Sequence, residues 1–468
     1  MAKVLLLESG VNRPENFVYQ LYPPTGLMYL AAYLRRQDPG HQIRLRDFLL
    51  ERRPAETLAD DLAAFHPDLV GIHAMSFQAP SLLRLAAAAK AAWPRAAVIA
   101  GGPHPTVDPG SVLAPGLVDA AVLGEGEVTF AEVVERVQQG RDLAGVPGTA
   151  VWRNGALVLG PDRPFLADLD QLPFPALDLI DPSAYFADRV LNQNDVRLRR
   201  EVATIFTSRA CPYGCIFCHN MFGKRFRGRS PENVLTEIEL LVREHGIREL
   251  HLIDDCFNLE RDRAKAILQG ILNRGLDLKL AFPNGLRGDR LDDELLGLLK
   301  KAGTYKINFG IESGSARIQK LIKKSLDLEV IADAVARTAA AGIFTHGFFM
   351  LGFPSETAAE MQETIAFACR LRLHTAGFAL LSPFPGTRAR EMALEMGIQV
   401  DYRPEETSYA KLSANLSAVD DATLLRLHRE AHRRFYFRPG QALRIWRSLP
   451  RKTDLFRLAR FHYRLKFA

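Results

Sequence analysis

Three cysteines lie within eight residues of one another, at Cys211, Cys215 and Cys218. Their spacing is C-x3-C-x2-C, and it follows a short apolar run at residues 202–206. Thiolates gathered in this way suit iron–sulfur clusters and zinc. Three thiolates on a four-iron cluster leave one iron open, so the pattern predicts a reactive metal centre.

A structural zinc site and a disulfide are the alternatives for this cysteine cluster. Zinc needs a fourth ligand, but His219 directly follows Cys218, which is a poor spacing for a tetrahedral site. The remaining cysteines, Cys256 and Cys369, lie far along the chain. Five cysteines in 468 residues indicate a reducing compartment, where disulfides are rare. We therefore favour the iron–sulfur interpretation.

The cysteine loop belongs to a region where apolar runs alternate with helical patterns. The runs lie at residues 202–206, 249–253, 278–282, 306–311, 345–351 and 377–381. Six such units in a row predict a partial (β/α)6 barrel over residues 201–395, with its active site at the carboxyl ends of the strands. The cysteines follow the first of these strands, so we expect them at that end.

Residues 1–144 show an earlier alternation of the same kind, with apolar runs at 4–7, 43–45, 69–72, 97–100 and 120–123. This pattern predicts an α/β, Rossmann-like parallel sheet covered on both faces by helices. Ligands of such sheets bind at the carboxyl ends of the strands. Those ends carry Ser76, Gly101, Gly102, His104, Gly124, Glu125 and Gly126. Glycines let a backbone approach a large ligand closely, although ordinary strand-to-helix turns are the alternative.

Two further regions complete the chain. Residues 145–200 are broken repeatedly by prolines and are expected to form a linker rather than a domain. Residues 396–468 are expected to be mainly helical, and from Leu427 onward they hold twelve Arg and Lys against two acids. This local excess is larger than the net charge of +6 for the whole chain. The rest of the protein is therefore slightly acidic, and no transmembrane segment is expected.

Cys-Pro-Tyr-Gly-Cys-Ile-Phe-Cys at 211–218, after the first strand of a βα barrel, resembles the radical S-adenosylmethionine superfamily. The resemblance implies that Cys211, Cys215 and Cys218 hold a [4Fe–4S] cluster. It also implies that S-adenosylmethionine chelates the fourth iron. One electron would then cleave this cosubstrate to a 5′-deoxyadenosyl radical, which takes a hydrogen atom from the substrate.

The resemblance extends along the barrel and implies contacts with S-adenosylmethionine at the ends of successive strands. The implied contacts are Phe217 near the adenine, Asp254 and Asp255 at the ammonium, Glu312 and Ser313 at the ribose and carboxylate, and Met350 and Gly352 at the adenine. Arg287 would reach the cosubstrate or the substrate, or serve as a structural ion-pair residue.

A Rossmann-like sheet before such a barrel resembles the cobalamin-binding class of these enzymes. That class includes the anaerobic magnesium-protoporphyrin monomethyl ester cyclase and the hopanoid-modifying group. The segments at 22–34, 101–105 and 124–127 carry the likeness. It implies cobalamin contacts at Ser76, Gly101, Gly102, His104, Gly124, Glu125 and Gly126. The Asp-x-His-x-x-Gly pattern that supplies a cobalt ligand elsewhere is absent, so the axial ligand stays unassigned.

The resemblance implies an enzyme that modifies an unactivated carbon of a small-molecule, lipid or tetrapyrrole substrate. Cobalamin-dependent C-methylation is the preferred reaction. Radical cyclisation, rearrangement or oxidation of the anaerobic-cyclase type is the alternative, and a non-catalytic cobalamin or redox sensor ranks below both. A transfer-RNA methylthiotransferase is disfavoured, because residues 1–210 lack the extra cysteines of that branch.

The same reasoning bears on partners and location. We expect a cytoplasmic enzyme that receives electrons from a low-potential donor such as flavodoxin or ferredoxin, with no nucleic-acid partner. The basic, aromatic C-terminal region would allow peripheral contact with an anionic membrane surface. An amphipathic helix that closes the barrel is the preferred interpretation of that region.

Overall fold

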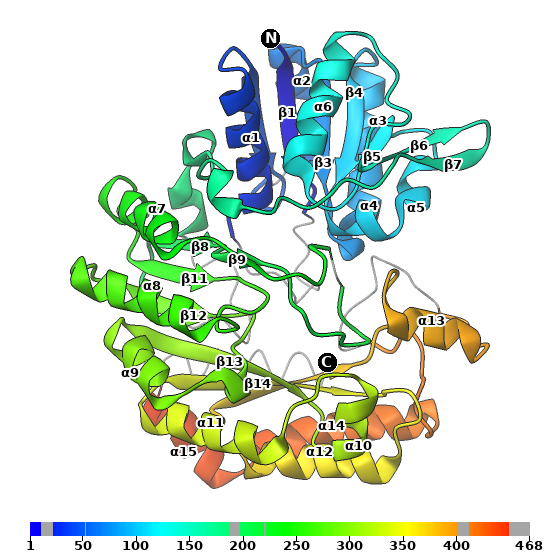
Figure 1. The fold of residues 1–468 in the computed structure, drawn as a ribbon. Coiled ribbons are helices and arrows are strands. Elements are labelled where there is room, and N and C mark those ends of the chain that lie inside the picture. Colours follow the sequence, from blue (N-terminus) through cyan, green and yellow to red (C-terminus); the bar gives the residue numbers. More distant parts are fainter. Residues whose placement is uncertain (11–21, 52, 187–196, 220, 401–410, 449–468) are drawn as a thin grey trace.

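The structure is a computed structural model, and it describes residues 1–10, 22–51, 53–186, 197–219, 221–400 and 411–448. Two largely parallel sheets make up the molecule. The sheet of the N-terminal half stands above that of the C-terminal half, and the last helices of the described chain lie below the second sheet (Figure 1). Both predicted α/β units are therefore present.

The first sheet has seven strands in the order β2-β1-β3-β4-β5-β6-β7. Strands β1 to β5 are parallel, as the alternating pattern predicted, whereas β6 and β7 are antiparallel. The bounds are β1 (Lys3–Glu8), β2 (Gln42–Asp47), β3 (Leu69–His73), β4 (Ala97–Gly101), β5 (Ala120–Val122), β6 (Thr149–Arg153) and β7 (Ala156–Leu159).

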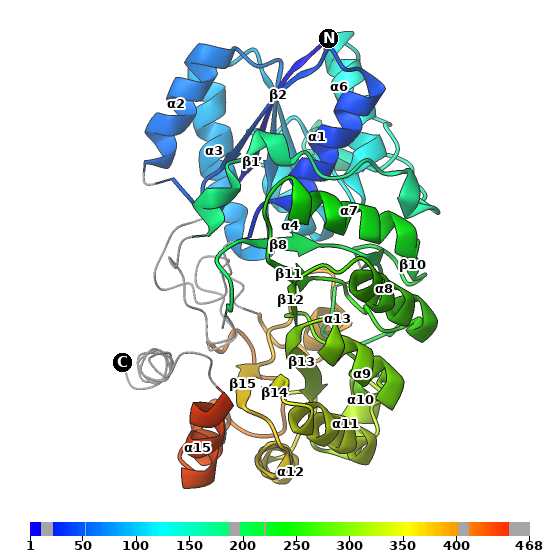
Figure 2. The ribbon, with the colours of Figure 1, turned by 90° about the vertical axis from the view of Figure 1, so that its left-hand side faces the viewer.

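Helices cover both faces of this sheet because its central strands, β1, β3 and β4, are apolar on both sides. Leu5 and Leu7 of β1 pack with the residues of α2 and α3, whereas Val4 and Leu6 pack with those of α1 and α6. Figure 2 shows these two helix pairs on opposite sides of β1 and β2. The helices are α1 (Thr25–Gln37), α2 (Pro54–Phe65), α3 (Ala79–Ala92), α4 (Pro103–Val107), α5 (Pro109–Leu113) and α6 (Gly126–Gln138).

The region expected to be a linker, 145–200, begins with a hairpin that extends the first sheet. Strand β6 pairs with β5 through Ala121 and Ala150, and β7 pairs with β6. The turn is Asn154-Gly155, and both residues have positive φ, at 51° and 78°. An Asn-Gly pair is a strong signal for a two-residue hairpin turn. The rest of the described region holds three short 3₁₀ helices, at Leu169–Gln171, Leu177–Leu179 and Pro182–Tyr185.

The second sheet has six parallel strands in the order β15-β14-β13-β12-β11-β8. The two outer strands, β8 and β15, are not paired with each other, so the sheet forms the expected partial barrel. The bounds are β8 (Val202–Ile205), β11 (Glu249–Leu252), β12 (Lys279–Phe282), β13 (Thr304–Glu312), β14 (Phe344–Leu351) and β15 (Thr375–Leu380).

Helices separate these strands and begin at capping residues that the sequence supplies. Ser230 accepts a hydrogen bond from the Asn233 amide at the start of α7, and Thr357 and Glu360 form a capping box on α12. The helices are α7 (Pro231–Arg243), α8 (Arg261–Asn273), α9 (Asp293–Lys301), α10 (Ala316–Leu321), α11 (Leu328–Ala340), α12 (Ala358–Arg370) and α13 (Arg388–Glu395).

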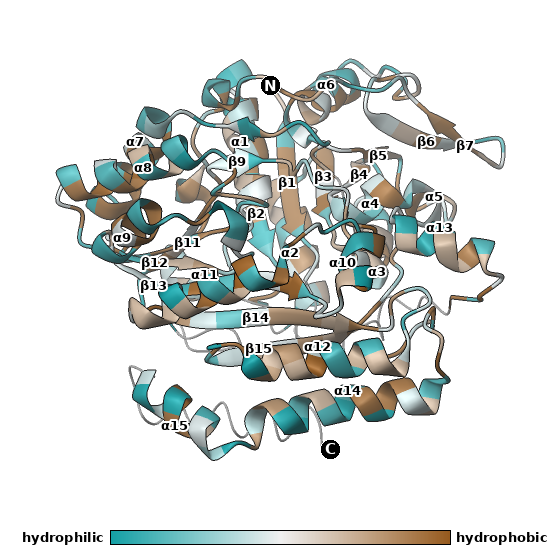
Figure 3. Cartoon of the chain, turned by 60° about the horizontal axis from the view of Figure 1, so that its bottom comes forward, coloured by the Kyte–Doolittle hydropathy of each residue, from teal (hydrophilic) through white to brown (hydrophobic). Residues whose placement is uncertain are grey.

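Two C-terminal helices, α14 (Asp421–Tyr436) and α15 (Pro439–Ser448), pack below the barrel. Leu424, Leu427 and Phe435 of α14 are buried in the barrel core, and polar residues alternate with them along the helix (Figure 3). The interpretation of this region as a closing helix is therefore consistent with the fold. Within the described residues, no helix is long and apolar enough to cross a membrane. The basic segment 449–468 lies outside the described residues.

Candidate functional site

The three cysteines lie in a loop closed by a short antiparallel hairpin. Its strands are β9 (Ser208–Arg209) and β10 (Arg227–Gly228), with Arg209 opposite Arg227. Ala210, which joins β9 to the first cysteine, has a left-handed φ of 72°, unusual for a residue with a Cβ. The hairpin therefore turns the chain sharply just before Cys211, directly after the first barrel strand.

Backbone hydrogen bonds fix the middle of this loop to the far side of the barrel. The Cys218 amide donates to the Cys215 carbonyl at 3.2 Å. The Ile216 amide donates to the Ile322 carbonyl at 3.2 Å, and the Ala389 amide donates to the Ile216 carbonyl at 2.8 Å. The loop thus bridges the ends of α10 and α13, and its cysteines have a defined backbone.

The surroundings of the thiols in the cysteine loop act on their pKa values in opposite directions. Burial, with smaller contributions from the Cys215 and Cys211 thiols, raises the pKa of the Cys218 thiol to about 11. The Lys324 ammonium opposes this increase at both Cys215 and Cys218. Iron binding would replace the protons on the thiols, because soft thiolates are its usual ligands. The described residues include no group of three His, Cys, Asp or Glu arranged around a single metal ion, whereas in a four-iron cluster the three thiolates would bind three different irons.

The two acids after β11 occupy different positions. Asp254 is buried, and its carboxylate accepts from the Thr207 amide at 2.6 Å and from the Ser208 hydroxyl at 2.8 Å. Its oxygens therefore hold the base of the hairpin. Asp255 is exposed and accepts from the Ala210 amide, which puts it beside the cysteine loop.

Glu312 ends β13 in a left-handed conformation, with φ at 69°, and the β13–β14 register shifts at the same point. Its carboxylate forms an ion pair with Lys324 at 2.9 Å. Strained backbone of this kind is found mainly at functional sites. The neighbouring Ser313 hydroxyl is buried against the Thr364 hydroxyl at 3.1 Å and accepts from the Ser315 amide, so it shapes the turn.

An apolar wall lies next to the cysteine loop. Phe217 packs against a buried cluster that includes Ile216, Met350 and Phe353, and the rings of Phe217 and Phe353 are 5.9 Å apart. Gly352 has a φ of 94°, which only glycine adopts readily, and its amide donates to Glu356 at 2.7 Å. A flat adenine ring would fit against such a surface.

The carboxyl edge of the first sheet carries two buried polar atoms without hydrogen-bond partners among the described residues. They are the Ser76 hydroxyl after β3 and His104 Nδ1 after β4. Burial lowers the pKa of His104, and its Nε2 lies 3.0 Å from the Ser111 hydroxyl. Unpartnered buried polar groups are costly, so they suit a ligand with many amides such as cobalamin.

Gly102 lets the chain pass closely over the same edge. Its φ is 99°, and a Cβ on it would lie 2.4 Å from the His73 ring. Gly101 has more room, with the Val122 Cβ at 4.0 Å, and Gly126 begins α6 beside Leu30. The structure therefore brings Ser76, Gly101, Gly102 and His104 to one sheet edge, and the residues present fit a bulky ligand.

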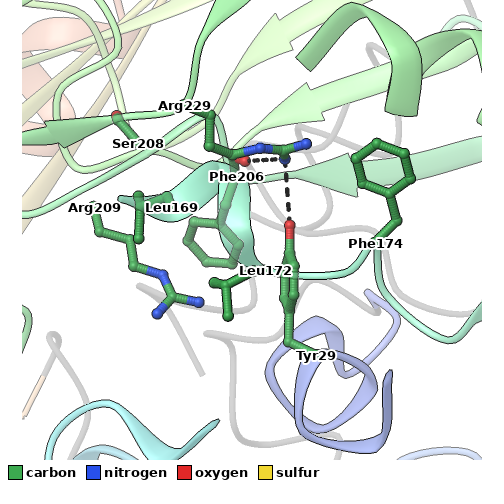
Figure 4. A pocket seen from close by; sticks show the side chains of 8 residues that line it. All are labelled: Tyr29, Leu169, Leu172, Phe174, Phe206, Ser208, Arg209 and Arg229. Atoms are coloured by element: carbon green, nitrogen blue, oxygen red, sulfur yellow. Dashed lines mark hydrogen bonds between the residues drawn. The ribbon is translucent and has the colours of Figure 1, made fainter. Parts of the chain in front are cut away.

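The segment after β5 faces the barrel rather than an open edge. Gly124 has a φ of 69°, and the Glu125 carboxylate accepts from Arg209, from Arg227 and from the Leu166 amide at 2.8–3.0 Å. Glu127 accepts from Arg209 at 2.5 Å. Arg209, Arg229 and Tyr29 line a small pocket, and Arg229 donates a hydrogen bond to the Tyr29 hydroxyl there (Figure 4). The Glu125 carboxylate is thus hydrogen-bonded to the arginines of the hairpin that carries the cysteines.

Sequence reasoning missed three of these charged residues. Lys324 lies in a Lys-Lys pair at 323–324, which by itself is typical of charged residues on a protein surface. Arg209 and Arg227 flank the cysteines, yet only their pairing with Glu125 gives them a role. Arg287 was predicted from the sequence to contact the cosubstrate or substrate, or to form a structural ion pair. Its guanidinium lies 3.7 Å from the centre of the Tyr213 ring and pairs with Asp289 at 2.8 Å.

Comparisons with known proteins agree with this geometry. The B12 binding domain family matches residues 17–134, and the Radical SAM superfamily matches residues 205–368. A protein named as an uncharacterized methyltransferase from Pyrococcus horikoshii is 34% identical over 93% of this chain and 93% of its own length. The chain therefore belongs to the radical S-adenosylmethionine enzymes that carry a cobalamin-binding domain.

Other relatives and structures fit the same class. Cytidylyl-2-hydroxyethylphosphonate methyltransferase from Streptomyces wedmorensis is 30% identical over 87% of this chain and 84% of its own. The cobalamin-dependent enzyme OxsB has the same fold, with a TM-score of 0.77, 16% identity, and coverage of 100% of this chain and 72% of that chain. The protein is an enzyme whose cofactors are a [4Fe–4S] cluster, S-adenosylmethionine and cobalamin.

Proposed function

We propose that this enzyme uses cobalamin to methylate an unactivated carbon of a small molecule. The observation that carries the proposal is the contact between the carboxyl edge of the first sheet and the hairpin that carries the cysteine loop. Glu125, at the carboxyl edge of the first sheet, accepts hydrogen bonds from Arg209, two residues before Cys211. This contact joins the edge proposed for cobalamin to the loop proposed for the cluster, so the two cofactors would serve one substrate.

The proposed roles follow from the positions of the side chains. Cys211, Cys215 and Cys218 hold the cluster, with Lys324 partly balancing the thiolate charge. Asp255, Glu312 and Ser313 bind the polar part of S-adenosylmethionine, and Phe217, Met350 and Gly352 bind its adenine. Asp254 supports the hairpin instead of contacting the cosubstrate, because Thr207 and Ser208 use its oxygens.

At the other edge, cobalamin meets Ser76, Gly101, Gly102, His104, Gly124 and Gly126, whereas Glu125 holds the hairpin. When bound, the cluster supplies the electron that cleaves S-adenosylmethionine, and cobalamin supplies the methyl group. The protein orients both, and the buried Ile216, Met350 and Phe353 form an apolar wall beside the cysteine loop.

An anaerobic reconstitution tests this function. The purified protein is loaded with iron, sulfide and hydroxocobalamin, and its cobalt content is measured. It is then given S-adenosylmethionine and a reductant, and the products are separated. Methylation predicts one cobalt per chain and both 5′-deoxyadenosine and S-adenosylhomocysteine. Formation of 5′-deoxyadenosine by a protein that binds no cobalt and releases no S-adenosylhomocysteine would contradict methylation.

Radical cyclisation or oxidation is the second candidate, and a specific relative favours it. The anaerobic magnesium-protoporphyrin IX monomethyl ester cyclase of Rubrivivax gelatinosus is 27% identical over 89% of this chain and 74% of its own. Both candidates need the same cluster and produce deoxyadenosine. They differ in S-adenosylhomocysteine, which only a methylating enzyme releases.

Membrane contact and the electron donor are finer parts of the proposal. Phe437, Leu443 and Trp446 on and before α15 are 73%, 45% and 45% exposed, and they precede the basic segment 449–468. Exposed aromatic and basic residues together favour an anionic lipid surface. Deleting residues 451–468 should then reduce sedimentation with anionic liposomes; unchanged sedimentation would exclude this contact.

In a cytoplasmic setting, flavodoxin or ferredoxin would supply the electron.

A further inference from the structure

Four charged side chains join the two halves of the molecule beneath the cysteine loop. Arg209 and Arg227 come from the hairpin, and Glu125 and Glu127 come from the turn between β5 and α6. Each side chain is less than a tenth exposed. We call these four residues the Arg–Glu bridge.

The geometry of the bridge is specific. Arg209 donates from Nη1 to Glu125 at 3.0 Å and from Nη2 to Glu127 at 2.5 Å. Arg227 donates from Nη1 to both oxygens of Glu125, at 2.8 and 3.0 Å, and to the Leu166 carbonyl at 2.7 Å. The two arginines face each other across β9 and β10, so both strands of the hairpin are fixed to one turn.

Burial makes this arrangement a weak source of stability but a strict geometric constraint. The three buried ion pairs lose hydration that their attraction only partly returns, and hydrophobic residues of similar size often stabilise a protein as well. Planar guanidinium groups, however, hold carboxylates in fixed directions. A bridge of this kind is suited to setting the position of the hairpin rather than to holding the fold together.

We propose that the Arg–Glu bridge is a positioning device that sets the cysteine loop at a fixed distance from the cobalamin-binding edge. This inference rests on the proposed function. In this role the four side chains pair with one another and position the loop, without taking part in the reaction themselves. Cleavage of S-adenosylmethionine needs only the cluster, whereas methyl transfer needs the cluster and cobalamin in register. Loosening the bridge should therefore separate the two outcomes.

The test compares Glu127→Gln with Glu132→Gln, a matched change on the same helix. Glu132 pairs with Arg136 and Arg163 and does not contact the hairpin. A double variant, Glu127→Gln with Arg209→Gln, keeps a neutral hydrogen-bonding pair in case the single change leaves an uncompensated buried charge that prevents folding.

Three readouts are expected to move together in both bridge variants and to stay unchanged in Glu132→Gln. Amide hydrogen exchange rises in peptides containing β9 and β10, measured on cluster-free protein. Spin coupling between cobalt(II) and the reduced cluster weakens in the loaded protein. The ratio of S-adenosylhomocysteine to deoxyadenosine falls by up to about 100-fold while deoxyadenosine formation continues, since a misplacement of about 1 Å costs that much.

The outcomes separate this inference from the proposed function. Lower thermal stability with unchanged exchange, coupling and product ratio would make the bridge merely structural and overturn the inference. If the wild-type protein releases no S-adenosylhomocysteine, methylation is wrong, but exchange and spin coupling still decide the role of the bridge. If the wild-type protein binds no cobalamin, hydrogen exchange alone decides it.

Discussion

At the scale of single residues, the five cysteines fall into two chemical groups. Cys211, Cys215 and Cys218 share one loop whose backbone is fixed at both ends, whereas Cys256 is buried in the fold and Cys369 lies on α12. The C-x3-C-x2-C motif assigns the cluster to the first group, although the Cys211 thiol also contributes to raising the pKa of Cys256. The distinction is one of position, because all five side chains are free thiols.

Replacing any one of Cys211, Cys215 and Cys218 with alanine should abolish stable cluster binding, because each change removes an iron ligand. Iron after anaerobic reconstitution should fall from about four atoms per chain towards zero. Cys256→Ala and Cys369→Ala are the controls and should keep wild-type iron. Loss of iron in either control, or its retention in a loop variant, would refute the ligand assignment.

Glu356 is a residue whose protonation should affect stability. It is fully buried, its Oε2 accepts from the Gly352 and Phe353 amides at 2.7 and 3.0 Å, and its Oε1 has no partner among the described residues. Burial raises the pKa of Glu356 to about 8. The folded protein therefore holds this carboxyl protonated at neutral pH, whereas the unfolded chain ionises it near 4.5.

The sign of the effect follows from this difference. A raised carboxyl pKa means that the folded state binds the extra proton, so stability declines as pH rises from the unfolded pKa to about 8. Between pH 6 and 9, wild type should lose about 3 kcal/mol of unfolding free energy relative to Glu356→Gln, which stays neutral. Chemical denaturation of both proteins at the two pH values measures this. Parallel pH profiles would contradict it.

At the scale of elements, the sequence predicted the strands well because periodicity is a local signal. Each predicted strand overlaps an observed one, from β1 to β15, since the parallel strands of both sheets are mostly buried apolar runs. The β6–β7 hairpin was missed inside a proline-rich stretch, although Asn154-Gly155 marks its turn. Its strand β7 is an apolar run, Ala-Leu-Val-Leu, but it is exposed and lies in the antiparallel hairpin, outside the strand–helix alternation that identified the others.

The turn between β4 and α4 depends on Gly102 for its shape. Gly102→Ala places a Cβ 2.4 Å from the His73 ring at a φ of 99°. The turn must then move, and cobalt bound per chain after reconstitution should fall at least about tenfold, while iron content stays unchanged. The expected loss is specific, because the cysteine loop lies on the other sheet.

Gly140→Ala is the matched control for this prediction. Gly140 also has a positive φ, at 63°, but no atom lies within 4 Å of a Cβ built there. It should therefore show the cost of backbone strain alone, about 1–2 kcal/mol, with normal cobalt content. Equal cobalt loss in both variants would mean that strain, rather than the shape of the edge, lowers binding.

At the scale of the whole molecule, the site exists only because two sheets meet. Residues 125 and 209 belong to different domains, and no local pattern pairs them. The sequence therefore predicted the cysteines and the glycine-rich edge, which are encoded in short segments. It could not predict that Glu125 would pair with Arg209 and Arg227, because that pairing depends on how the two domains pack.

A second contact between the domains passes through a buried carboxylate. The Tyr22 hydroxyl, beside the first sheet, is 2.5 Å from His251 Nδ1, and His251 Nε2 is 2.8 Å from Glu249. Glu249 also accepts from the Tyr305 hydroxyl and from the Leu198 and Arg199 amides, each at 2.7–2.8 Å. One carboxylate thus connects the barrel, the linker and, through His251, the cobalamin-binding domain.

Glu249→Gln should therefore weaken the whole assembly. Burial opposes ionisation of Glu249, but hydrogen bonds from His251 and Tyr305 hold its pKa below the ordinary value. A lowered carboxyl pKa contributes stability above the unfolded pKa that is lost as pH falls through the folded one. The variant should lose about 1–3 kcal/mol of unfolding free energy at pH 7, and the difference should shrink as pH falls below the ordinary carboxyl pKa of 4.5.

Chemical denaturation monitored by two probes, one in each domain, would measure this loss. Because the carboxylate connects both domains, both probes should shift together in Glu249→Gln. Glu244→Gln, the same chemical change at an exposed position after α7, should stay within about 0.5 kcal/mol of wild type. A shift confined to the barrel probe would mean that Glu249 stabilises its own sheet, and that the domains are held together by other contacts such as the Arg–Glu bridge.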